Sequence, residues 1–375
     1  MRSVVLSVAV GLSVPLLGSC ASATETGQSE AGGEVSVIAT DTACELRASS
    51  APAGPTTFAV RNDGSLAIEF YVYAADGTSV VAEAANIAPG SVGELAVALD
   101  AGDYITACSP GMTGDGIRGQ FTVTESGKEL ATDPLAVAGS TAYVRWAQQQ
   151  ADELLTGTKD FAVAIKAGDV ARARELYPQV RQHWERIEPV AESFGDLDPV
   201  LDARVNDLEP GQEFTGWHRL ERDLWKDGLQ PDSPQVAAQM VSDTEDLVAR
   251  IAVLELTADR ITNGSKELLD EVATGKITGE EERYSHTDLW DFAANVQGSQ
   301  RGYEELRPLI DARDPQLARQ LDEQFAAMVA LLDEYRRGDG FVPYTELSDK
   351  DIRVLSAQLE ALSEPVSQLT AVVLR

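Results

Sequence analysis

The stretch AYVRWAQQQADELLTGTKDFAVAIKAG, residues 142–168, decides the fold class of the second part of this chain. Its apolar residues recur every three or four positions and form one helical stripe, made by Val144, Ala147, Ala151, Leu154, Leu155, Phe161 and Ile165. Similar segments follow as far as the C-terminus, and several begin with Ser, Asp or Ser-Pro, which are typical of helix starts. We therefore predict an antiparallel helical bundle over residues 137–375.

The preceding residues have a different period. Apolar and polar residues alternate in segments such as EVSVIAT (34–40) and TTFAVRN (56–62), which is typical of β-strands. Six or seven such segments are separated by Gly, Pro, Asn and Asp, so residues 34–125 are predicted to form a β-sandwich. With residues 126–136 as a linker, the predicted fold class is multidomain, a β-sandwich followed by an all-α domain.

The N-terminus reads MRSVVLSVAVGLSVPLLGSC, residues 1–20. A basic residue, a short apolar run and small residues before Cys20 resemble a bacterial lipoprotein signal, which is cut before the cysteine. We predict a signal peptide over 1–19, lipidation of Cys20 and a flexible tether over 20–33. The expected location is extracytoplasmic, on a membrane reached through acyl chains, either periplasmic or on the outer face. An ordinary signal peptide that ends near a cysteine is the alternative.

The net charge is −31, from 61 acidic and 30 basic residues among 375. A surface this negative repels phosphate backbones, so we expect no nucleic-acid partner. The charge favours cations, although a solvated acidic surface alone would explain it equally well.

All three histidines, His183, His218 and His286, lie in the helical part, each near acids and a tryptophan. Residues three or four apart share a helical face, so His218 and Glu221 are predicted to project together. An imidazole and carboxylates on consecutive turns can bind one metal ion. Because one such pair also arises by chance, a surface or capping role for His218 is the alternative.

Four strings in the helical part are distinctive as a set: HWERIEPVAESFGDLD (183–198), FTGWHRLE (214–221), LLDEVATGKITGEEERYSHTDLWDF (268–292) and NVQGS (295–299). Together they resemble the imelysin-type domain of the EfeO/EfeM family. In the β-region, Cys44-Glu45, Glu69, NIAPGS and YITACSPGM resemble the cupredoxin-like domain of the same family. The resemblance implies a lipid-anchored, iron-binding component of an EfeUOB-type iron importer. Its partners would be an EfeU-type permease and an EfeB-type haem peroxidase.

Carried onto this sequence, the resemblance implies metal ligands that are mostly acidic, namely Glu185, Glu188, Asp202, His218, Glu221 and Glu281. One imidazole and several carboxylates suit iron, as Fe2+ or Fe3+, as well as manganese or zinc. His183 and His286 are expected to orient these ligands from behind. No catalytic residue is predicted.

Cys44 and Cys108 have two alternative roles in the β-region. Two cysteines in an exported domain favour a disulfide. The resemblance instead implies a metal site made by Cys44, Glu69, Cys108 and Met112, with sulfur ligands that would suit copper. The region contains no histidine, so a blue-copper site is not supported. The two alternatives exclude each other.

Other functions remain as alternatives. The imelysin family carries a peptidase label, but the HExxH string of common zinc peptidases is absent here, so we do not expect a peptidase. A ferroxidase would require copper in the β-domain. An envelope lipoprotein that binds another divalent metal or a polymer is the remaining alternative.

Overall fold

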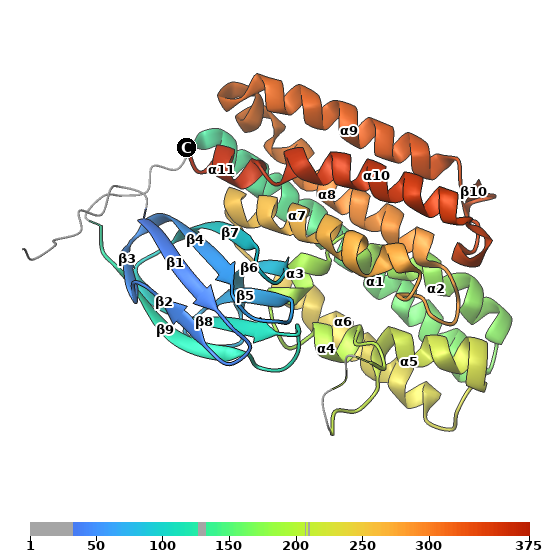
Figure 1. The fold of residues 1–375 in the computed structure, drawn as a ribbon. Helices are drawn as coiled ribbons and strands as arrows, with labels where there is room; N and C mark the ends of the chain where they lie inside the picture. Colours follow the sequence, from blue (N-terminus) through green and yellow to red (C-terminus); the bar gives the residue numbers. More distant parts are fainter. Residues whose placement is uncertain (1–32, 127–132, 207, 209–210) are drawn as a thin grey trace, which may run out of the picture. The chain divides into compact units, whose positions relative to one another are not determined.

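The computed structural model describes residues 33–126, 133–206, 208 and 211–375. The predicted signal peptide, Cys20 and most of the predicted tether lie outside these residues. Figure 1 shows strands in the first part of the chain and helices in the second. The predicted fold class, β followed by all-α, is confirmed.

Two sheets make up the β-part. One has the strand order β2-β1-β4-β7 and the other has the order β3-β9-β8-β5-β6. The strands are β1 (Gly33–Ala39), β2 (Cys44–Leu46), β3 (Ser50–Pro52), β4 (Gly54–Asn62), β5 (Ile68–Tyr73), β6 (Val80–Ile87), β7 (Val92–Leu99), β8 (Gly102–Pro110) and β9 (Ile117–Thr124).

The alternating pattern places one face of each sheet in a common core. On β4, Phe58 and Val60 are buried while the residues between them are more exposed, as the period of two requires. The Phe58 ring lies 5.3 Å from the Phe70 ring of β5 and 5.2 Å from the Phe121 ring of β9. Residues of both sheets therefore meet in one apolar core.

The helical part begins at Pro134. Its helices are α1 (Pro134–Ala167), α2 (Val170–Glu185), α3 (Glu188–Glu192), α4 (Asp198–Leu201), α5 (Gly216–Arg222), α6 (Ser233–Ile251), α7 (Ala258–Thr274), α8 (Asp288–Arg313), α9 (Pro315–Asp333), α10 (Asp349–Val366) and α11 (Leu369–Val373). Short π-helical and 3₁₀ turns lie at Asp223–Asp227, Lys276–Thr278 and Tyr344–Glu346, and a small hairpin pairs β10 (Arg336–Arg337) with β11 (Gly340–Phe341). Within the described ranges, no helix is long and apolar enough to cross a membrane.

The ends of α1 follow from its sequence. The Asp133 side chain accepts a hydrogen bond from the Leu135 amide at 2.9 Å, and Pro134 occupies the first turn, where its missing N–H is tolerated. Gly168 ends the helix in the left-handed conformation, with a φ of 71°. The predicted stripe is largely buried, and α1 packs with it against α2, α6 and α8.

Candidate metal centre

Two of the predicted ligands come from a break between two helices. α2 ends at Glu185 and α3 begins at Glu188, because Pro189 has no N–H and its ring would collide with the Glu185 carbonyl in a continuous helix. That carbonyl instead accepts a hydrogen bond from Asn295 Nδ2 at 2.9 Å. The carboxyl groups of Glu185 and Glu188 are both buried and both approach the same amide, at 3.2 and 3.3 Å.

Asp202 and His218 meet because α4 and α5 pack closely. Asp202 directly follows α4, and α5 begins at Gly216. Gly216 has a φ of 75°, and a Cβ there would collide with the Leu201 carbonyl oxygen. Glycine therefore allows the approach. As a result, His218 Nε2 lies 3.5 Å from Asp202 Oδ1.

The segment 275–287, between α7 and α8, supplies two more buried acids, Glu281 and Glu282. Glu281 Oε1 lies 3.5 Å from His218 Nε2. The Ser285 hydroxyl of the same segment donates a hydrogen bond to Glu282 Oε2 at 2.8 Å. The segment therefore both provides and orients carboxylates.

Glu221 is held by the backbone of that segment. Its Oε1 accepts hydrogen bonds from the amides of Tyr284 and Ser285, each at 2.7 Å. The other oxygen, Oε2, lies 3.5 Å from His218 Nδ1. His218 and Glu221 therefore share one face of α5, in the relation that their spacing predicts.

The six residues predicted as ligands all belong to one buried cluster. With Glu282 as a seventh member, their potential ligand atoms lie within 4.8 Å of one another in each of three groups, which are Asp202, His218 and Glu281; His218, Glu221 and Glu282; and Glu185, Glu188 and Asp202. The donors are one imidazole and otherwise carboxylates. This set is preferred by hard or borderline cations such as iron, manganese and zinc.

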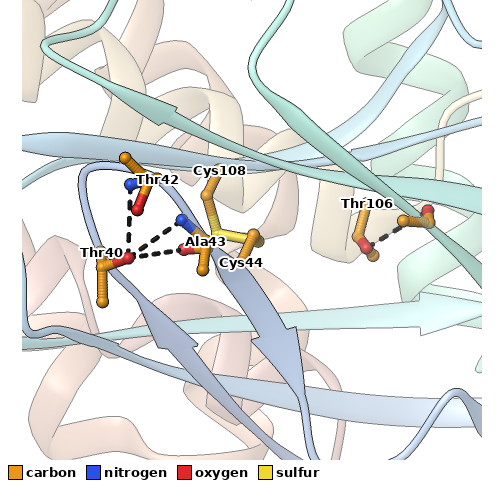
Figure 2. Close-up of a disulfide and its surroundings, with 7 residues drawn as sticks. Thr40, Thr42, Ala43, Cys44, Thr106 and Cys108 are labelled. Atoms are coloured by element: carbon orange, nitrogen blue, oxygen red, sulfur yellow. Dashed lines mark hydrogen bonds between the residues drawn. A yellow bond between two sulfur atoms is a disulfide. The ribbon is translucent and has the colours of Figure 1, made fainter.

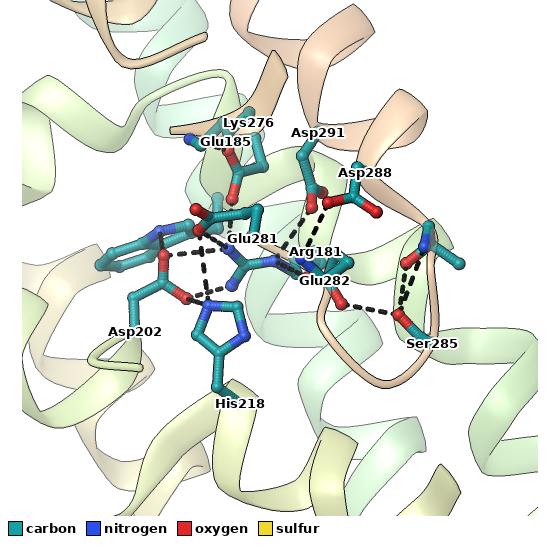
Figure 3. Close-up of polar contacts among 12 residues, drawn as sticks. Arg181, Glu185, Asp202, His218, Lys276, Glu281, Glu282, Ser285, Asp288 and Asp291 are labelled. Atoms are coloured by element: carbon teal, nitrogen blue, oxygen red, sulfur yellow. Dashed lines mark hydrogen bonds and ion pairs between the residues drawn. The ribbon is translucent and has the colours of Figure 1, made fainter. Parts of the chain in front are cut away.

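Arg181 of α2 lies in the middle of this cluster and is fully buried. Its guanidinium forms ion pairs with Glu185 at 2.6 Å, with Glu282 at 2.6 Å and with Asp202. Glu281 and Asp291 lie slightly further away, at 3.3 and 3.5 Å. Figure 3 shows the guanidinium surrounded by these carboxylates, with the His218 ring beside it.

Lys276 supplies a second internal cation. Its Nζ lies 2.6 Å from Glu185, 2.8 Å from Glu188 and 2.9 Å from Glu271, and its side chain is buried. The ammonium group therefore balances part of the negative charge of the acids at the break between α2 and α3. Among the carboxylates around His218, Asp202, Glu281 and Glu282 share Arg181, and Glu281 also forms an ion pair with Arg204 at 2.5 Å.

Burial and neighbouring acids perturb the pKa values of this cluster. Burial, reinforced by Glu188, raises the pKa of Glu185 to about 7 against the opposing effects of Lys276 and Arg181. Burial, reinforced by Glu271, raises that of Glu188 to about 8. Such carboxyl groups hold protons near neutral pH, because their charged forms are poorly solvated.

The His218 ring is 2% exposed. Burial and the Arg181 guanidinium both act to lower its pKa, but the carboxylates of Glu221, Glu281 and Asp202 outweigh them and raise the pKa to about 10. The ring is therefore cationic at neutral pH, and a metal ion would replace its proton. Neither ring nitrogen makes a hydrogen bond to any residue that the structure describes. Both ring nitrogens therefore face carboxylates with which they form no hydrogen bond.

Comparisons with known proteins agree with this architecture. The imelysin family model matches residues 139–369, and the model of a cupredoxin-like domain matches residues 12–123. The iron uptake system component EfeO of Escherichia coli (strain K12) is 39% identical over 346 residues, which cover 90% of this chain and 91% of the relative. The EfeO protein of Shigella flexneri matches with the same identity and coverage. This chain belongs to the EfeO/EfeM family.

A more distant likeness concerns the fold alone. A solved precursor protein from Parabacteroides distasonis ATCC 8503 superposes on this EfeO/EfeM chain with a TM-score of 0.51 and 15% sequence identity. The match covers 65% of this chain and 97% of the other. At this identity it supports the architecture and carries no argument about ligands.

Two histidines that were expected to orient the ligands have other surroundings in this family member. The His183 ring contacts Gln150 at 3.0 Å, Arg186 at 3.2 Å and Glu153 at 3.5 Å, and none of these residues belongs to the cluster. His286 has a φ of 59°, and its backbone carbonyl accepts a hydrogen bond from the Tyr344 amide. His286 thus helps to shape segment 275–287 through its backbone.

In the cupredoxin-like part, Cys44 and Cys108 form a disulfide (Figure 2). It joins β2 of one sheet to β8 of the other. Cys108 pairs with Phe70, whereas Glu69 pairs with Ser109, so Glu69 and Cys108 project from opposite faces of the sheet. Met112 is 44% exposed in the turn after β8. Of the two alternatives for the cysteines, the structure has the disulfide, which leaves no thiolate for copper.

Several residues of the cluster could not be predicted from their spacing along the chain. Arg181 lies four positions before Glu185, an ordinary helical ion-pair spacing, and Lys276 lies far from its partners in sequence. Glu282 lies next to Glu281 and four positions before His286, a spacing that does not show that it faces His218. Asp291, which is buried beside Arg181, stands in the string used for the family resemblance. Only the three-dimensional arrangement shows which of these charges meet.

Proposed function

We propose that this protein is an extracytoplasmic iron-binding component of an iron uptake system. Its helical domain would capture iron through Asp202, His218, Glu221 and Glu281, with Glu185 and Glu188 completing the set. The observation that carries the proposal is a buried cluster in which the imidazole of His218 faces carboxylates on both of its nitrogens. The relatives named as iron uptake components support iron as the cargo.

The residues present fit a metal ion as cargo. The Oε2 atom of Glu221 and both nitrogens of His218 are buried without a hydrogen bond to the described residues. Leaving such atoms unpaired costs free energy, which a bound cation would recover. The oxygen-rich donor set favours iron over a soft ion such as Cu(I), and leaves zinc and manganese as competitors.

Delivery to a membrane would follow from the rest of the chain. We propose that acyl chains on Cys20 hold the protein on the membrane, and that iron passes to an EfeU-type permease with an EfeB-type haem peroxidase as a second partner. The signal-like sequence before Cys20 supports the anchor. The family membership supports the partners.

Replacing His218 and Glu221 together tests the proposal. The variant His218→Ala/Glu221→Ala should lose saturable binding of Fe2+ in an anaerobic calorimetric titration, while far-ultraviolet circular dichroism keeps its helical signal. The matched control is His183→Ala/Glu153→Ala, which removes another His–Glu pair with the same separation of 3.5 Å outside the cluster. Iron binding should survive in this control. Unchanged iron binding in the first variant would refute the proposal.

A further inference from the structure

The His218 ring separates the cluster into two groups of ligands. On one side, Nε2 lies 3.5 Å from Asp202 Oδ1 and from Glu281 Oε1. On the other side, Nδ1 lies 3.5 Å from Glu221 Oε2, and Glu282 completes the group. Because the two nitrogens of an imidazole point in different directions, one cation cannot use both. Asp202 and Glu281 therefore face Nε2, whereas Glu221 faces Nδ1 and shares a second group with Glu282.

Hydrogen bonds hold the carboxylates on the Nδ1 side of the His218 ring in place. Glu221 is fixed by two backbone amides through Oε1, which leaves Oε2 directed toward the ring. Glu282 is fixed by the hydroxyl of Ser285 at 2.8 Å and by that of Tyr177 at 3.2 Å. Hydrogen bonds that orient carboxylates from behind are the usual support of metal ligands.

Unpartnered atoms mark this side independently of its acidity. His218 Nδ1 and Glu221 Oε2 are both buried and make no hydrogen bond within the described part of the chain. Asp291, which lies beside Arg181, is 1% exposed, and neither of its carboxylate oxygens has a hydrogen-bond partner among the described residues. Buried oxygens without partners are unfavourable unless a cation or a proton compensates them.

The single positive charge of Arg181 does not neutralise both groups of carboxylates. The Arg181 guanidinium faces Asp202 and Glu281 with its terminal nitrogens, and Glu282 with Nε. It therefore divides one positive charge between the two sides. Arg204 adds a second cation at Glu281, on the Nε2 side. The Nδ1 side has two carboxylates of its own and shares the charge of Arg181 with the other side.

We infer that His218 bridges two cation sites, so that the chain binds two metal ions, one at Asp202, His218 Nε2 and Glu281 and the other at Glu221, His218 Nδ1 and Glu282. The inference rests on the proposed function and deepens it by assigning the second ion. The ligands suit hard or borderline divalent cations such as Fe2+, Mn2+ or Zn2+. With an ion on each nitrogen, both ring protons pass to solvent and the ring bridges as an imidazolate.

The number of bound ions tests the inference. Purified protein is titrated with Zn2+ alone in a calorimeter, since zinc does not change its oxidation state, and bound zinc is then measured by elemental analysis after gel filtration. We expect two ions for the unmodified chain and one for Glu282→Gln. The matched control is Glu280→Gln, which changes a neighbouring, largely exposed acid and should keep two ions.

The possible outcomes distinguish a failure of the second cation site from a failure of the proposed function. One ion in both the unmodified chain and Glu282→Gln would overturn the second site and leave the proposed function standing. Two ions in both would also overturn it, because the second ion would then lie elsewhere. No bound zinc in the unmodified chain would overturn the second site, and the Fe2+ titration of the unmodified chain would then decide the proposed function. If Glu282→Gln loses its circular dichroism signal, Glu221→Gln gives the same test from α5 and should also bind one ion.

Discussion

At the scale of single residues, the buried cations Arg181 and Lys276 and the His218 ring determine the charge of the candidate metal centre. Arg181 and Lys276 are buried among carboxylates, as a metal ion would be. Burying such charges is costly, and removing one partner of a buried ion pair commonly destabilises a protein by about 3–5 kcal/mol. The internal cations therefore keep the acidic cluster folded without metal, and an incoming ion has to compete with them.

The protons on this cluster predict how metal affinity depends on pH. Burial raises the pKa of Glu185 to about 7 and that of Glu188 to about 8, and the neighbouring acids raise that of His218 to about 10. A protonated group cannot bind a metal ion, so binding releases protons and strengthens as the pH rises from about 6 to about 8. The gain is about tenfold per pH unit for each proton released.

Calorimetric titration with Zn2+ checks this pH dependence. The apparent heat should differ between two buffers of unequal ionisation enthalpy, because protons pass to the buffer. An affinity that is constant between pH 6 and pH 8, with equal heats in both buffers, would contradict the predicted proton release.

At the scale of elements, the sequence predicts which residues share a face of one helix but not which residues of different helices come into contact. The period of the apolar residues predicts the long helices, and a spacing of three places His218 and Glu221 on one face of α5. The family resemblance, rather than any spacing, pointed to Asp202 and Glu281. Their meeting depends on tertiary packing, such as the close approach at Gly216, which no local pattern encodes. For the same reason, Arg181 and Lys276 could not be assigned.

Segment 275–287 is the element on which the centre depends most. Gly279 has a φ of 74°, and a Cβ there would collide with the Tyr344 ring, whose hydroxyl is hydrogen-bonded to the Ile277 carbonyl. Gly279→Ala should therefore lower the free energy of unfolding by about 1–3 kcal/mol more than a substitution without this collision. It should also weaken metal binding, because the segment carries the candidate ligands Glu281 and Glu282.

Gly338→Ala is the matched control for this prediction. Gly338 also has a positive φ, 63°, but no described atom lies within 4 Å of the position that its Cβ would take. Gly338→Ala should lower the free energy of unfolding only by the conformational cost of about 1–2 kcal/mol and should leave the metal affinity unchanged. Chemical denaturation and zinc titration of both variants give the comparison. Equal effects on stability would show that Tyr344 does not constrain the segment.

At the scale of the whole molecule, the two parts are stabilised by different means. The helical part has an extensive apolar core around its buried charges, whereas the β-part has a smaller core and a disulfide between its two sheets. The sulfur atoms take no part in the cluster around His218. Stability of the β-part and metal binding should therefore respond to different substitutions.

Removing the disulfide tests this independence. Cys44→Ala/Cys108→Ala should lower the free energy of unfolding by about 2–5 kcal/mol, since the bridge closes a loop with a sequence separation of 64. Thermal unfolding followed by circular dichroism measures the loss. The number of bound zinc ions should equal that of the unmodified chain, and a reduced number would show that the β-part contributes to the centre.

The order of the ligands along the chain has a consequence for biosynthesis. His218 and Glu221 leave the ribosome roughly sixty residues before Glu281 and Glu282. When Glu221 has been made, Glu185, Glu188 and Asp202 are already present, but the full set of donors exists only after Glu281 and Glu282 have been added and the helical part has folded around them. The proposed metal ion would thus be taken from the metal pool of the compartment in which the chain folds, rather than from the pool that surrounds its translation.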